Sequence, residues 1–421
     1  MPQYLSPGVY VEEVPSSIRA IAGVSTSTPG FIGIVPDDIH LVAKREPTPA
    51  DKTPFKLVNF KVPAPSGTPV LVTNWSQFTR LFGDLIGDAA ADATNDPSPS
   101  QSLSHQLLAH AVYGFFNNGG SRCFVVRIGA ITDLDAALKA LAAVDEVSIV
   151  AAPGIIDDAT RDKLVTHCTQ TGDRFAILDG PDKATDLTTL TRTPADATPG
   201  VAPKRTDLGA WYFPWIKVFD PATKLQTPDG DGLLAVPPSG HMAGIYARVD
   251  NARGVHKAPA NEAVLGALDV SQPISKADQD GLNPKGVNCI RVLNDNILAF
   301  GARTIGGDGN GDTKYINVRR TLLFLRESIE EGMQFVVFEP NTPALWQKIT
   351  RNTTAFLTNV FRSGALFGTT PAEAFFVKCD AETNPPELRE LGQVVTEIGV
   401  AIVRPAEFVI FRISQVALSA K

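Results

Sequence analysis

The chain has 421 residues, an apolar share of 43% and a formal net charge of -7. A chain of this length is expected to form about two or three domains, and its apolar residues suffice for extensive hydrophobic cores. The excess of acidic residues excludes a general affinity for nucleic acid or for an anionic membrane, so any basic surface must be local.

The cysteines stand far apart, without a CxxC pair, beside apolar or small residues typical of buried positions. We expect reduced core thiols at Cys123, Cys168, Cys289 and Cys379. Residues 1–5 lack a basic segment followed by an apolar one, and no apolar run is long enough to span a bilayer. These features predict a protein that folds in the cytoplasm.

An isolated β-rich octet lies near the start of the chain. Residues 7–14 read Pro-Gly-Val-Tyr-Val-Glu-Glu-Val, and Pro15 follows directly. A strand this isolated needs partners from elsewhere. The segments 36–70 and 84–102 are crowded with Pro, Asp, Thr, Ser and Ala, and they predict surface loops or an insertion.

From residue 122 onward, apolar runs alternate with stretches of helical character. The apolar runs are 123–128, 147–151, 174–178 and 211–218, and the helical stretches are 132–143 and 157–170. Strands buried on both faces and separated by crossover helices predict a parallel α/β sheet. The segment 181–208, rich in Thr, Asp, Ala and Pro, interrupts this alternation and is expected to be an exposed insertion.

Beyond residue 290 the order becomes mixed and predicts a second, α+β domain. The expected strands are 297–301, 334–338, 374–379, 393–403 and 407–416, and the expected helices are 317–331 and 343–362. Thr342 and Pro343 supply an N-cap and a first-turn proline for the second helix. No period of about 20 to 50 residues recurs, which argues against a solenoid or a propeller.

The glycine-rich segment 306–312 resembles a calcium loop only in its first half. Asp308, Asn310 and Asp312 alternate as EF-hand ligands do, but Thr313 and Arg319 occupy the places that need Gly and Glu. A flexible hairpin loop is favoured. No Gly-Lys-Ser/Thr follows, so a phosphate-binding loop is excluded.

A hydrolase is the sharper enzymatic alternative, because Ser239, His241 and His256 lie in the α/β half. No Gly-x-Ser-x-Gly motif accompanies them, and Ser239 suits the first turn of a helix better than an exposed nucleophile. His105 and His110 are one residue off the spacing that would place both on one helical face. Satisfied or solvent-exposed histidines are therefore expected, and catalysis is disfavoured.

Basic residues gather on the second C-terminal helix, where Lys348 and Arg351 are one turn apart and Arg362 follows. Such charges often only solvate a helix face. On an acidic protein they also suit a docking surface for an acidic partner. The sequence leaves both interpretations open.

Short segments over nearly the whole chain share the pattern of one family. They are 6–13, 28–33, 120–127, 173–179, 212–218, 237–240, 246–250, 253–261, 301–304, 315–320, 338–341, 374–380 and 405–413. In this order they resemble the tail sheath family of contractile phages and phage-like injection systems. Family members usually carry Trp where this chain has His256, which weakens a catalytic role for that histidine.

The resemblance implies a subtilisin-like α/β outer domain without catalytic residues, an α+β inner domain, and terminal strand arms exchanged between subunits. The expected divisions are an arm at 1–22, an α/β domain at 23–290, an inner domain at 291–404 and an arm at 405–421. The strand residues between subunits would be Val9, Tyr10, Val11, Glu12, Phe408, Val409, Ile410, Phe411, Arg412 and Ile413. Lys348, Arg351 and Arg362 would be the inner-tube contact.

The resemblance further implies a structural subunit without enzymatic activity, cofactor or metal. It would polymerise as stacked hexameric rings around an inner tube and contract by rigid-body rotation about flexible segments near 17–27 and 403–406. Its partners would be itself, the tube protein, and baseplate and tail-terminator proteins, with no nucleic acid and no membrane insertion. Assembly would take place in the cytoplasm, as part of a phage tail or phage-like particle released by lysis.

Overall fold

The structure, a computed structural model, describes residues 21–49, 52–94 and 101–410. Its contacts divide the chain into two units. Among the described residues, the larger α/β unit holds 24–326 and 402–410, and the smaller C-terminal unit holds 21–23 and 327–401. The chain therefore returns to the α/β unit after completing the C-terminal unit.

A mixed nine-stranded sheet forms the centre of the α/β unit, within the part of the chain that the structure describes. In spatial order its strands are β11 (Glu262–Ala263), β14 (Asn296–Phe300), β13 (Val287–Leu293), β8 (Gly209–Phe213), β7 (Phe175–Asp179), β6 (Ile149–Ala151), β1 (Pro29–Ile34), β5 (Cys123–Ile128) and β4 (Val70–Val72). The strands from β13 to β5 run parallel, and antiparallel strands close both edges. The predicted parallel α/β sheet is confirmed.

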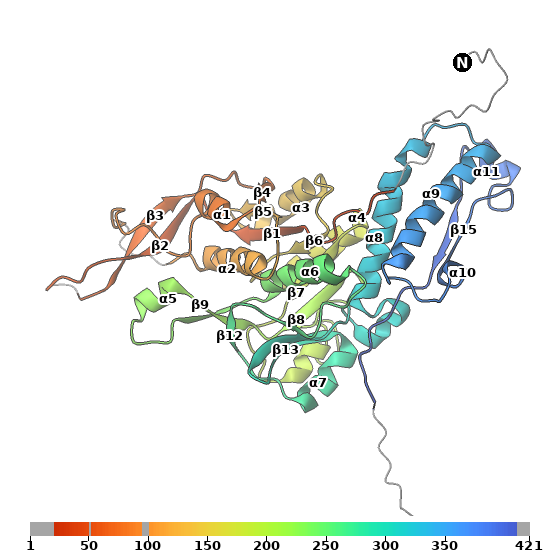
Figure 1. The fold of residues 1–421 in the computed structure, drawn as a ribbon. Coiled ribbons are helices and arrows are strands. Elements are labelled where there is room, and N and C mark those ends of the chain that lie inside the picture. The colour runs from red at the N-terminus through yellow and green to blue at the C-terminus, as the bar shows by residue number, and fades with distance from the viewer. Residues whose placement is uncertain (1–20, 50–51, 95–100, 411–421) are drawn as a thin grey trace, which may run out of the picture. The chain divides into compact units, whose positions relative to one another are not determined.

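Helices cover both faces of this sheet (Figure 1). They are α1 (Trp75–Phe82), α2 (Leu103–Asn117), α3 (Leu134–Ala142), α4 (Asp158–Thr171), α6 (Ser239–Arg253) and α7 (Lys276–Leu282). In β1, a side chain on Gly30 would lie 2.7 Å from Leu141 of α3, and one on Gly33 would lie 2.7 Å from Leu108 of α2. Odd and even positions of a strand face opposite sides, so α2 and α3 pack on opposite faces.

Smaller elements surround the main sheet. Strands β2 (Asp38–Lys44) and β3 (Phe55–Lys61) form an antiparallel hairpin, and α5 (Pro221–Gln226) lies beside β2 (Figure 1). A further sheet has the order β10 (Leu233–Val236), β9 (Ile216–Phe219) and β12 (Ala267–Val270). The 3-10 segments of this unit are η1 (Ile131–Asp133), η2 (Leu187–Thr191), η3 (Asn283–Lys285) and η4 (Gly307–Thr313).

The C-terminal unit is built around one long helix and a small sheet. Helix α8 (Ile316–Met333) begins in the α/β unit, and its residues from Glu327 on belong to the C-terminal unit. The other elements are η5 (Gln334–Val336), α9 (Pro343–Arg362), α10 (Pro371–Ala374), β15 (Phe375–Lys378), α11 (Pro386–Glu390) and β16 (Glu397–Val400). Leu345, Trp346 and Ile349 of α9 pack with Cys379 as a buried cluster. The two predicted helices are confirmed.

The structure corrects several expectations. The segment 36–70 is not only loop, because Ile39, Leu41 and Val58 of its hairpin are buried. The expected strand 334–338 is instead the 3-10 turn η5, with Val337 and Phe338 exposed. The apolar run 211–218 is two strands, β8 and β9. The composition of 36–70 concealed the alternating apolar residues of the hairpin, and the other two segments are apolar runs whose sequence does not specify their strand partners.

The expected domain boundary at residue 290 also differs from the structure. Strands β13 and β14 form an antiparallel pair inside the nine-stranded sheet, so the segment after residue 290 continues the α/β unit. The structural division falls between Arg326 and Glu327, within α8. The expected strand 407–416 is not present over 407–410, and 411–416 lie outside the described residues.

The expectation for the cysteines is confirmed. Cys123, Cys168, Cys289 and Cys379 are free and buried. Burial raises the pKa of Cys168 and that of Cys289 to about 12, and it also raises the pKa of Cys123. Because the thiolate is the reactive form, these thiols are poor nucleophiles.

Candidate interaction surfaces

Helix α9 carries all three basic residues predicted to contact a tube. Arg351 and Arg362 are exposed, and Lys348 is half-buried with its Nζ 4.7 Å from the centre of the Phe335 ring. This contact is a cation–π interaction. The opposite face of α9 is buried through Leu345, Trp346, Ile349, Asn352, Thr353, Phe356, Leu357 and Val360.

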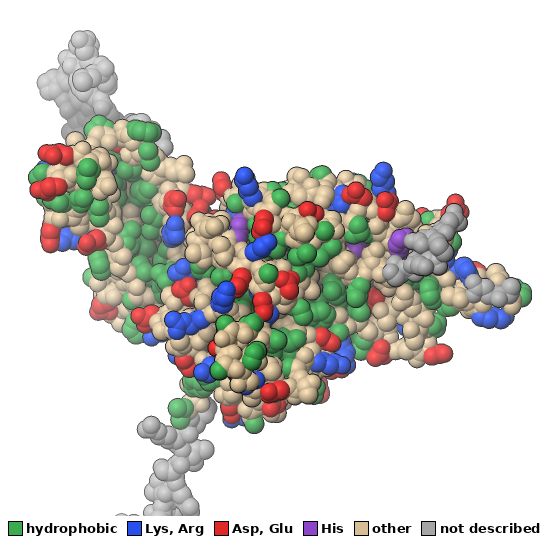
Figure 2. Space-filling model, turned by 180° about the vertical axis from the view of Figure 1, so that it is seen from behind, with side chains coloured by type: hydrophobic (Ala, Val, Ile, Leu, Met, Phe, Trp, Pro, Cys, Tyr) green, Lys and Arg blue, Asp and Glu red, His purple; other side chains and the backbone are tan. Residues whose placement is uncertain are grey.

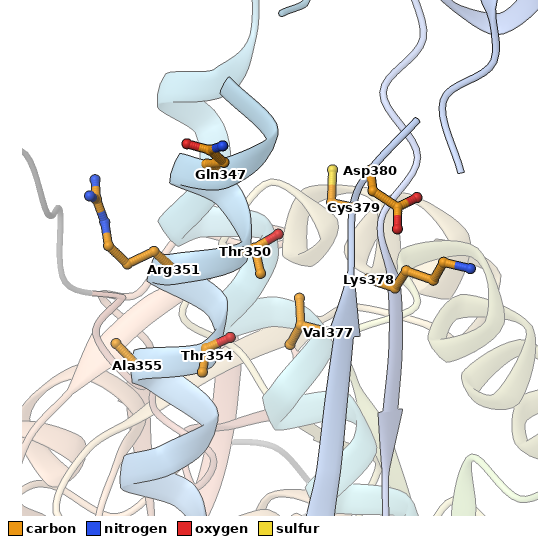
Figure 3. Close-up of a pocket in the computed structure, with 9 residues that line it drawn as sticks. All are labelled: Gln347, Thr350, Arg351, Thr354, Ala355, Val377, Lys378, Cys379 and Asp380. Carbon is orange, nitrogen blue, oxygen red and sulfur yellow. The ribbon is translucent and has the colours of Figure 1, made fainter. Parts of the chain in front are cut away.

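An open groove of 620 Å³ runs between α9 and β15 in the C-terminal unit (Figure 3). It is lined by Gln347, Thr350, Arg351, Thr354 and Ala355 of α9, and by Val377, Lys378, Cys379 and Asp380. In Figure 3 the Arg351 side chain extends away from β15. Lys378 is paired with Glu382 at 2.6 Å. The helix wall of the groove thus offers mainly neutral side chains, and the opposite wall carries the charged residues Lys378 and Asp380.

Strands β15 and β16 pair in an antiparallel two-stranded sheet, from Phe375 opposite Val400 to Lys378 opposite Glu397. Within the described residues no third strand joins this sheet. Phe376 is 58% exposed, and the residues of β16 are half-buried or exposed. Unpaired strand edges are templates for an added strand.

The predicted C-terminal arm is described only as far as Ile410. Phe408, Val409 and Ile410 are exposed by 71%, 69% and 77% and lie in no strand of the described chain. The arm residues Phe411, Arg412 and Ile413 lie outside the described residues, as do Val9, Tyr10, Val11 and Glu12. Three consecutive exposed apolar residues are costly unless a partner covers them.

Ser239 is the first residue of α6, which confirms its predicted place in the first turn of a helix. Its hydroxyl donates to Asp179 at 2.7 Å and its backbone N–H donates to the same carboxylate at 2.8 Å. Burial raises the pKa of Asp179 to about 7. This Ser–Asp pair is fully buried and joins the end of β7 to the start of α6.

The buried histidines of α2 and α6 meet the expectation of satisfied or solvent-exposed histidines only in part. His110 lies 3.0 Å from Asp220, and His241 fills the space that a side chain on Gly114 would take. The His105 ring is buried beside the backbone of Phe82 and Gly83, and Nδ1 of His241 has no hydrogen-bond partner within the described structure. The packing around these histidines excludes water. The spacing of histidines in the sequence does not reveal this burial.

Acid is expected to destabilise the α/β unit through His105 and His241. Burial lowers the pKa of His105 from 6.5 to about 4 and that of His241 from 6.5 to about 3. The folded state thus holds these groups neutral, while the unfolded state takes up protons below pH 6.5. Stability is full above 6.5 and falls as pH drops toward 4 and 3, by about 1.4 kcal/mol per pH unit and group.

Thermal melting between pH 7.5 and 4.5 checks this expectation. The matched variant is His105→Leu, whose pH dependence should be shallower than that of the unchanged protein. Equal slopes for both proteins would show that His105 does not contribute.

A buried network joins the segment 246–250 to α8. Arg320 forms two hydrogen bonds with Asp250, at 2.9 and 2.6 Å, and both side chains are at most 4% exposed. Thr26 donates to Asp250 at 2.6 Å, and the Arg320 guanidinium lies 4.6 Å from the Tyr246 ring centre. The hydroxyls of Tyr246 and Tyr212 are 2.8 Å apart. Both segments carry the family resemblance, but their contact joins residues 70 positions apart and leaves no local signal in the sequence.

The segment 306–312 is not the predicted hairpin loop, because it forms the 3-10 segment η4 before α8. Asp308 pairs with Arg303 at 2.9 Å and with Lys314 at 3.0 Å. Asn310 donates to Thr206, Thr304 and Ile305. These side chains thus bind protein groups. No cluster of three or more His, Cys, Asp or Glu suited to a metal occurs in the described part of the chain.

Acidic and basic side chains are interspersed over the face shown in Figure 2. No helix in the described ranges combines the length and apolar character required to cross a bilayer.

Comparison with curated proteins finds two tail sheath proteins. That of Burkholderia phage BcepMu is 26% identical over 203 residues, or 46% of this chain and 40% of that protein. That of Vibrio phage KVP40 is 24% identical over 180 residues, or 42% of this chain and 25% of that protein. The matched stretch is therefore less than half the length of either relative.

Solved structures match over nearly the full length. The sheath complex of the extracellular contractile injection system PVC, contracted, has a TM-score of 0.70 and 26% identity, covering 99% of both chains. The contracted helical sheath of the anti-feeding prophage has a TM-score of 0.69 and 27% identity, covering 97% of this chain and 99% of that one.

Two family models match successive parts of the chain. The phage tail sheath protein central domain matches residues 129–305, and the phage tail sheath C-terminal domain matches residues 308–415. Together they span well over half of the sequence, on a mixed α/β fold that the solved sheath structures share. The chain belongs to the phage tail sheath family.

Proposed function

We propose that the chain is the structural sheath subunit of a contractile injection system. The observation that carries this proposal is the exposed apolar segment Phe408–Ile410, together with a two-stranded sheet that no third strand joins among the described residues. An open sheet edge and an exposed segment that lies in no strand complement each other, since an added strand supplies hydrogen bonds to both. The full-length similarity to contracted sheath structures supports the same reading.

In this proposal the terminal arms of one subunit complete the β15–β16 sheet of its neighbours. The arm residues are Val9 to Glu12 and Phe408 to Ile413. Such a contact joins different surfaces of identical subunits, and contacts of this kind build open helical polymers or closed rings. The proposed assembly consists of stacked hexameric rings around an inner tube, with baseplate and tail-terminator proteins at the ends.

Contraction then proceeds by rigid-body rotation of the subunits while the arms keep them linked. The α/β unit has a subtilisin-like fold in this proposal, and its role is structural. It catalyses no reaction, binds no nucleic acid and does not insert into a membrane. The energy is stored at assembly, and no nucleotide is consumed. Assembly takes place in the cytoplasm, and lysis releases the particle.

Polymerisation tests this function directly. The purified chain, alone and with its tube protein, is examined by sedimentation and negative-stain microscopy. Rings or long tubes are expected. A monomer that stays monomeric with the tube protein present would refute the proposal, and peptide cleavage would favour the hydrolase alternative.

The basic residues of α9 are proposed to contact the tube. Replacing Lys348 and Arg351 by Glu is expected to raise, by about tenfold or more, the tube-protein concentration needed for half-maximal co-sedimentation, because attraction becomes repulsion. The melting temperature should fall by only a few degrees, since the exposed Arg351 contributes about 0–1 kcal/mol to stability and the Lys348–Phe335 contact about 0.5–1 kcal/mol. Arg362→Glu makes the same test of tube binding at the C-terminal end of α9.

Lys276 and Lys285, both exposed on the α/β unit, provide the matched control. Their double replacement by Glu makes the same change in net charge away from α9. Equal loss of tube binding in both double variants would mean that net charge alone matters, and would remove α9 from the interface.

A further inference from the structure

Glu407 is the most firmly held residue of the segment that leads into the C-terminal arm. Arg303 donates to both of its carboxylate oxygens, from Nε and Nη2, each at 2.8 Å. Asn283 donates to it at 2.7 Å and the Tyr315 hydroxyl at 3.0 Å. The Glu407 side chain is 18% exposed and that of Arg303 is 3% exposed. One carboxylate thus receives four hydrogen bonds, two of them from a buried guanidinium.

The donors are themselves fixed by the α/β unit. Arg303 Nη1 lies 2.9 Å from Asp308, and the Arg303 backbone N–H donates to Asn288 at 2.8 Å. Asn283 belongs to η3, and Tyr315 is the residue before α8. The donors of this site are therefore held in place by the fold of the α/β unit, and the Glu407 carboxylate binds to them.

Two further contacts involve the residues just before Glu407, and the second of them joins exposed side chains and is expected to restrict the segment little. Asn317 donates to the carbonyl of Val403 at 3.2 Å, and Arg404 pairs with Asp312 at 2.6 Å. Directly after Glu407, Phe408 is 71% exposed. The change from held to exposed thus falls between residues 407 and 408, and not at the flexible segment expected at 403–406.

We propose that Glu407 and its donors Arg303, Asn283 and Tyr315 form a clamp that sets where the C-terminal arm leaves the α/β unit. Glu407 is then a positioning residue for strand exchange, and this role rests on the proposed function. Charge-assisted, bidentate hydrogen bonds of this kind are among the strongest in proteins. The clamp restricts the arm before assembly, so that less freedom is lost when a neighbour binds it.

The charge balance at the site supports the clamp. The groups that face Glu407 are Arg303 and Tyr315, with Asp308 and Lys314 behind them. Burial alone would raise the pKa of Glu407, but the hydrogen bonds from Arg303, Asn283 and Tyr315 hold it below its ordinary value. Glu407 is therefore ionised at neutral pH.

A spin label at Ala406→Cys tests the clamp in the full chain. Ala406 is exposed, and the four native cysteines are buried, so labelling is selective. Glu407→Gln keeps the size of the side chain but places an amide donor among the donors of the site. We expect the rotational correlation time of the label to shorten by about threefold or more, and Tyr315→Phe to give an intermediate value.

The matched control is Asp312→Asn, which breaks an ion pair of the same segment whose side chains are 60% and 93% exposed. It should leave the label unchanged, and circular dichroism should show that all variants are folded. A label equally mobile in the unchanged protein and in Glu407→Gln would overturn the clamp. So would an equal effect of Asp312→Asn.

Tube assembly tests the positioning role separately. Unlabelled Glu407→Gln is expected to need about tenfold more subunit to form tubes, and assembly equal to that of the unchanged protein would overturn the positioning role. Normal tubes from both Val409→Pro and Ile410→Pro would instead overturn strand exchange and the positioning role with it. If strand exchange fails in this way, immobilisation of the label in isolated subunits would still support the clamp. Failure of the clamp and failure of the proposed function can therefore be told apart.

Discussion

Asp250→Ala is expected to lower the free energy of unfolding of the α/β unit by about 3–5 kcal/mol. The substitution leaves the guanidinium of Arg320 buried without its carboxylate, which is the most costly way to break an ion pair. Thr26 loses its acceptor at the same time. The pair ties α6 to α8 and to the segment before β1, so the loss should spread through the unit.

Thermal and urea unfolding, followed by circular dichroism, measure this effect. The matched control is Asp280→Ala, which removes a pair with Lys276 whose side chains are 67% and 84% exposed. That change should cost less than about 1 kcal/mol. Similar losses in both variants would show that burial of the Asp250–Arg320 pair does not determine its contribution.

Local sequence signals predicted the parts of the fold that local interactions determine. Thr342 and Pro343 marked the start of α9, and Val318, Leu322, Leu325 and Ile329 recur at helical spacing within the helix expected at 317–331. The two helices begin and end within about two residues of the prediction. The alternating buried runs likewise located β5, β6 and β7, because parallel strands buried on both faces leave a continuous apolar signal.

The run 334–338 shows why apolar character alone misleads. It reads Gln-Phe-Val-Val-Phe, which suits a strand, yet Phe338 has a φ of 67° and is fully exposed. Left-handed backbone is unfavourable for an aromatic residue. A strand exists only where a partner strand is available, and the sequence of a short segment does not show where its partner lies.

The contacts that matter most for the candidate surfaces join distant residues. Arg320 lies 70 residues from Asp250, and Arg303 lies 104 residues from Glu407. Single residues at such separations carry no periodic signal, so the sequence predicted an arm but not its clamp. Resemblance identified the segments that contain these residues, and the structure then supplied the physical reason for their presence.

Ile410→Pro is expected to abolish tube formation while leaving a soluble, folded subunit. Ile410 is 77% exposed, so its replacement removes no contact from the core of its own unit. In an exchanged strand the same residue would pair with a neighbour. Proline lacks the backbone N–H and is excluded from central strand positions, so the ladder between subunits would break there.

Two further variants test which backbone N–H groups of the arm pair with the neighbouring subunit. Successive N–H groups of a strand point to opposite sides, so Val409→Pro tests the alternate position. Ile410→Thr keeps the N–H and a β-branched side chain, and it should assemble nearly as the unchanged protein does. Val11→Pro makes the corresponding test in the N-terminal arm.

Val126→Pro is the control for disruption inside the fold. Val126 is fully buried in β5 and pairs with Ile32 of β1, so proline there should unfold the α/β unit or lower its melting temperature by several degrees. Ile410→Pro should instead melt as the unchanged protein does and fail only in electron microscopy of tubes. Normal tubes from both arm proline variants, Val409→Pro and Ile410→Pro, would refute exchange of the C-terminal strand, and a destabilised monomer would place Ile410 in its own core.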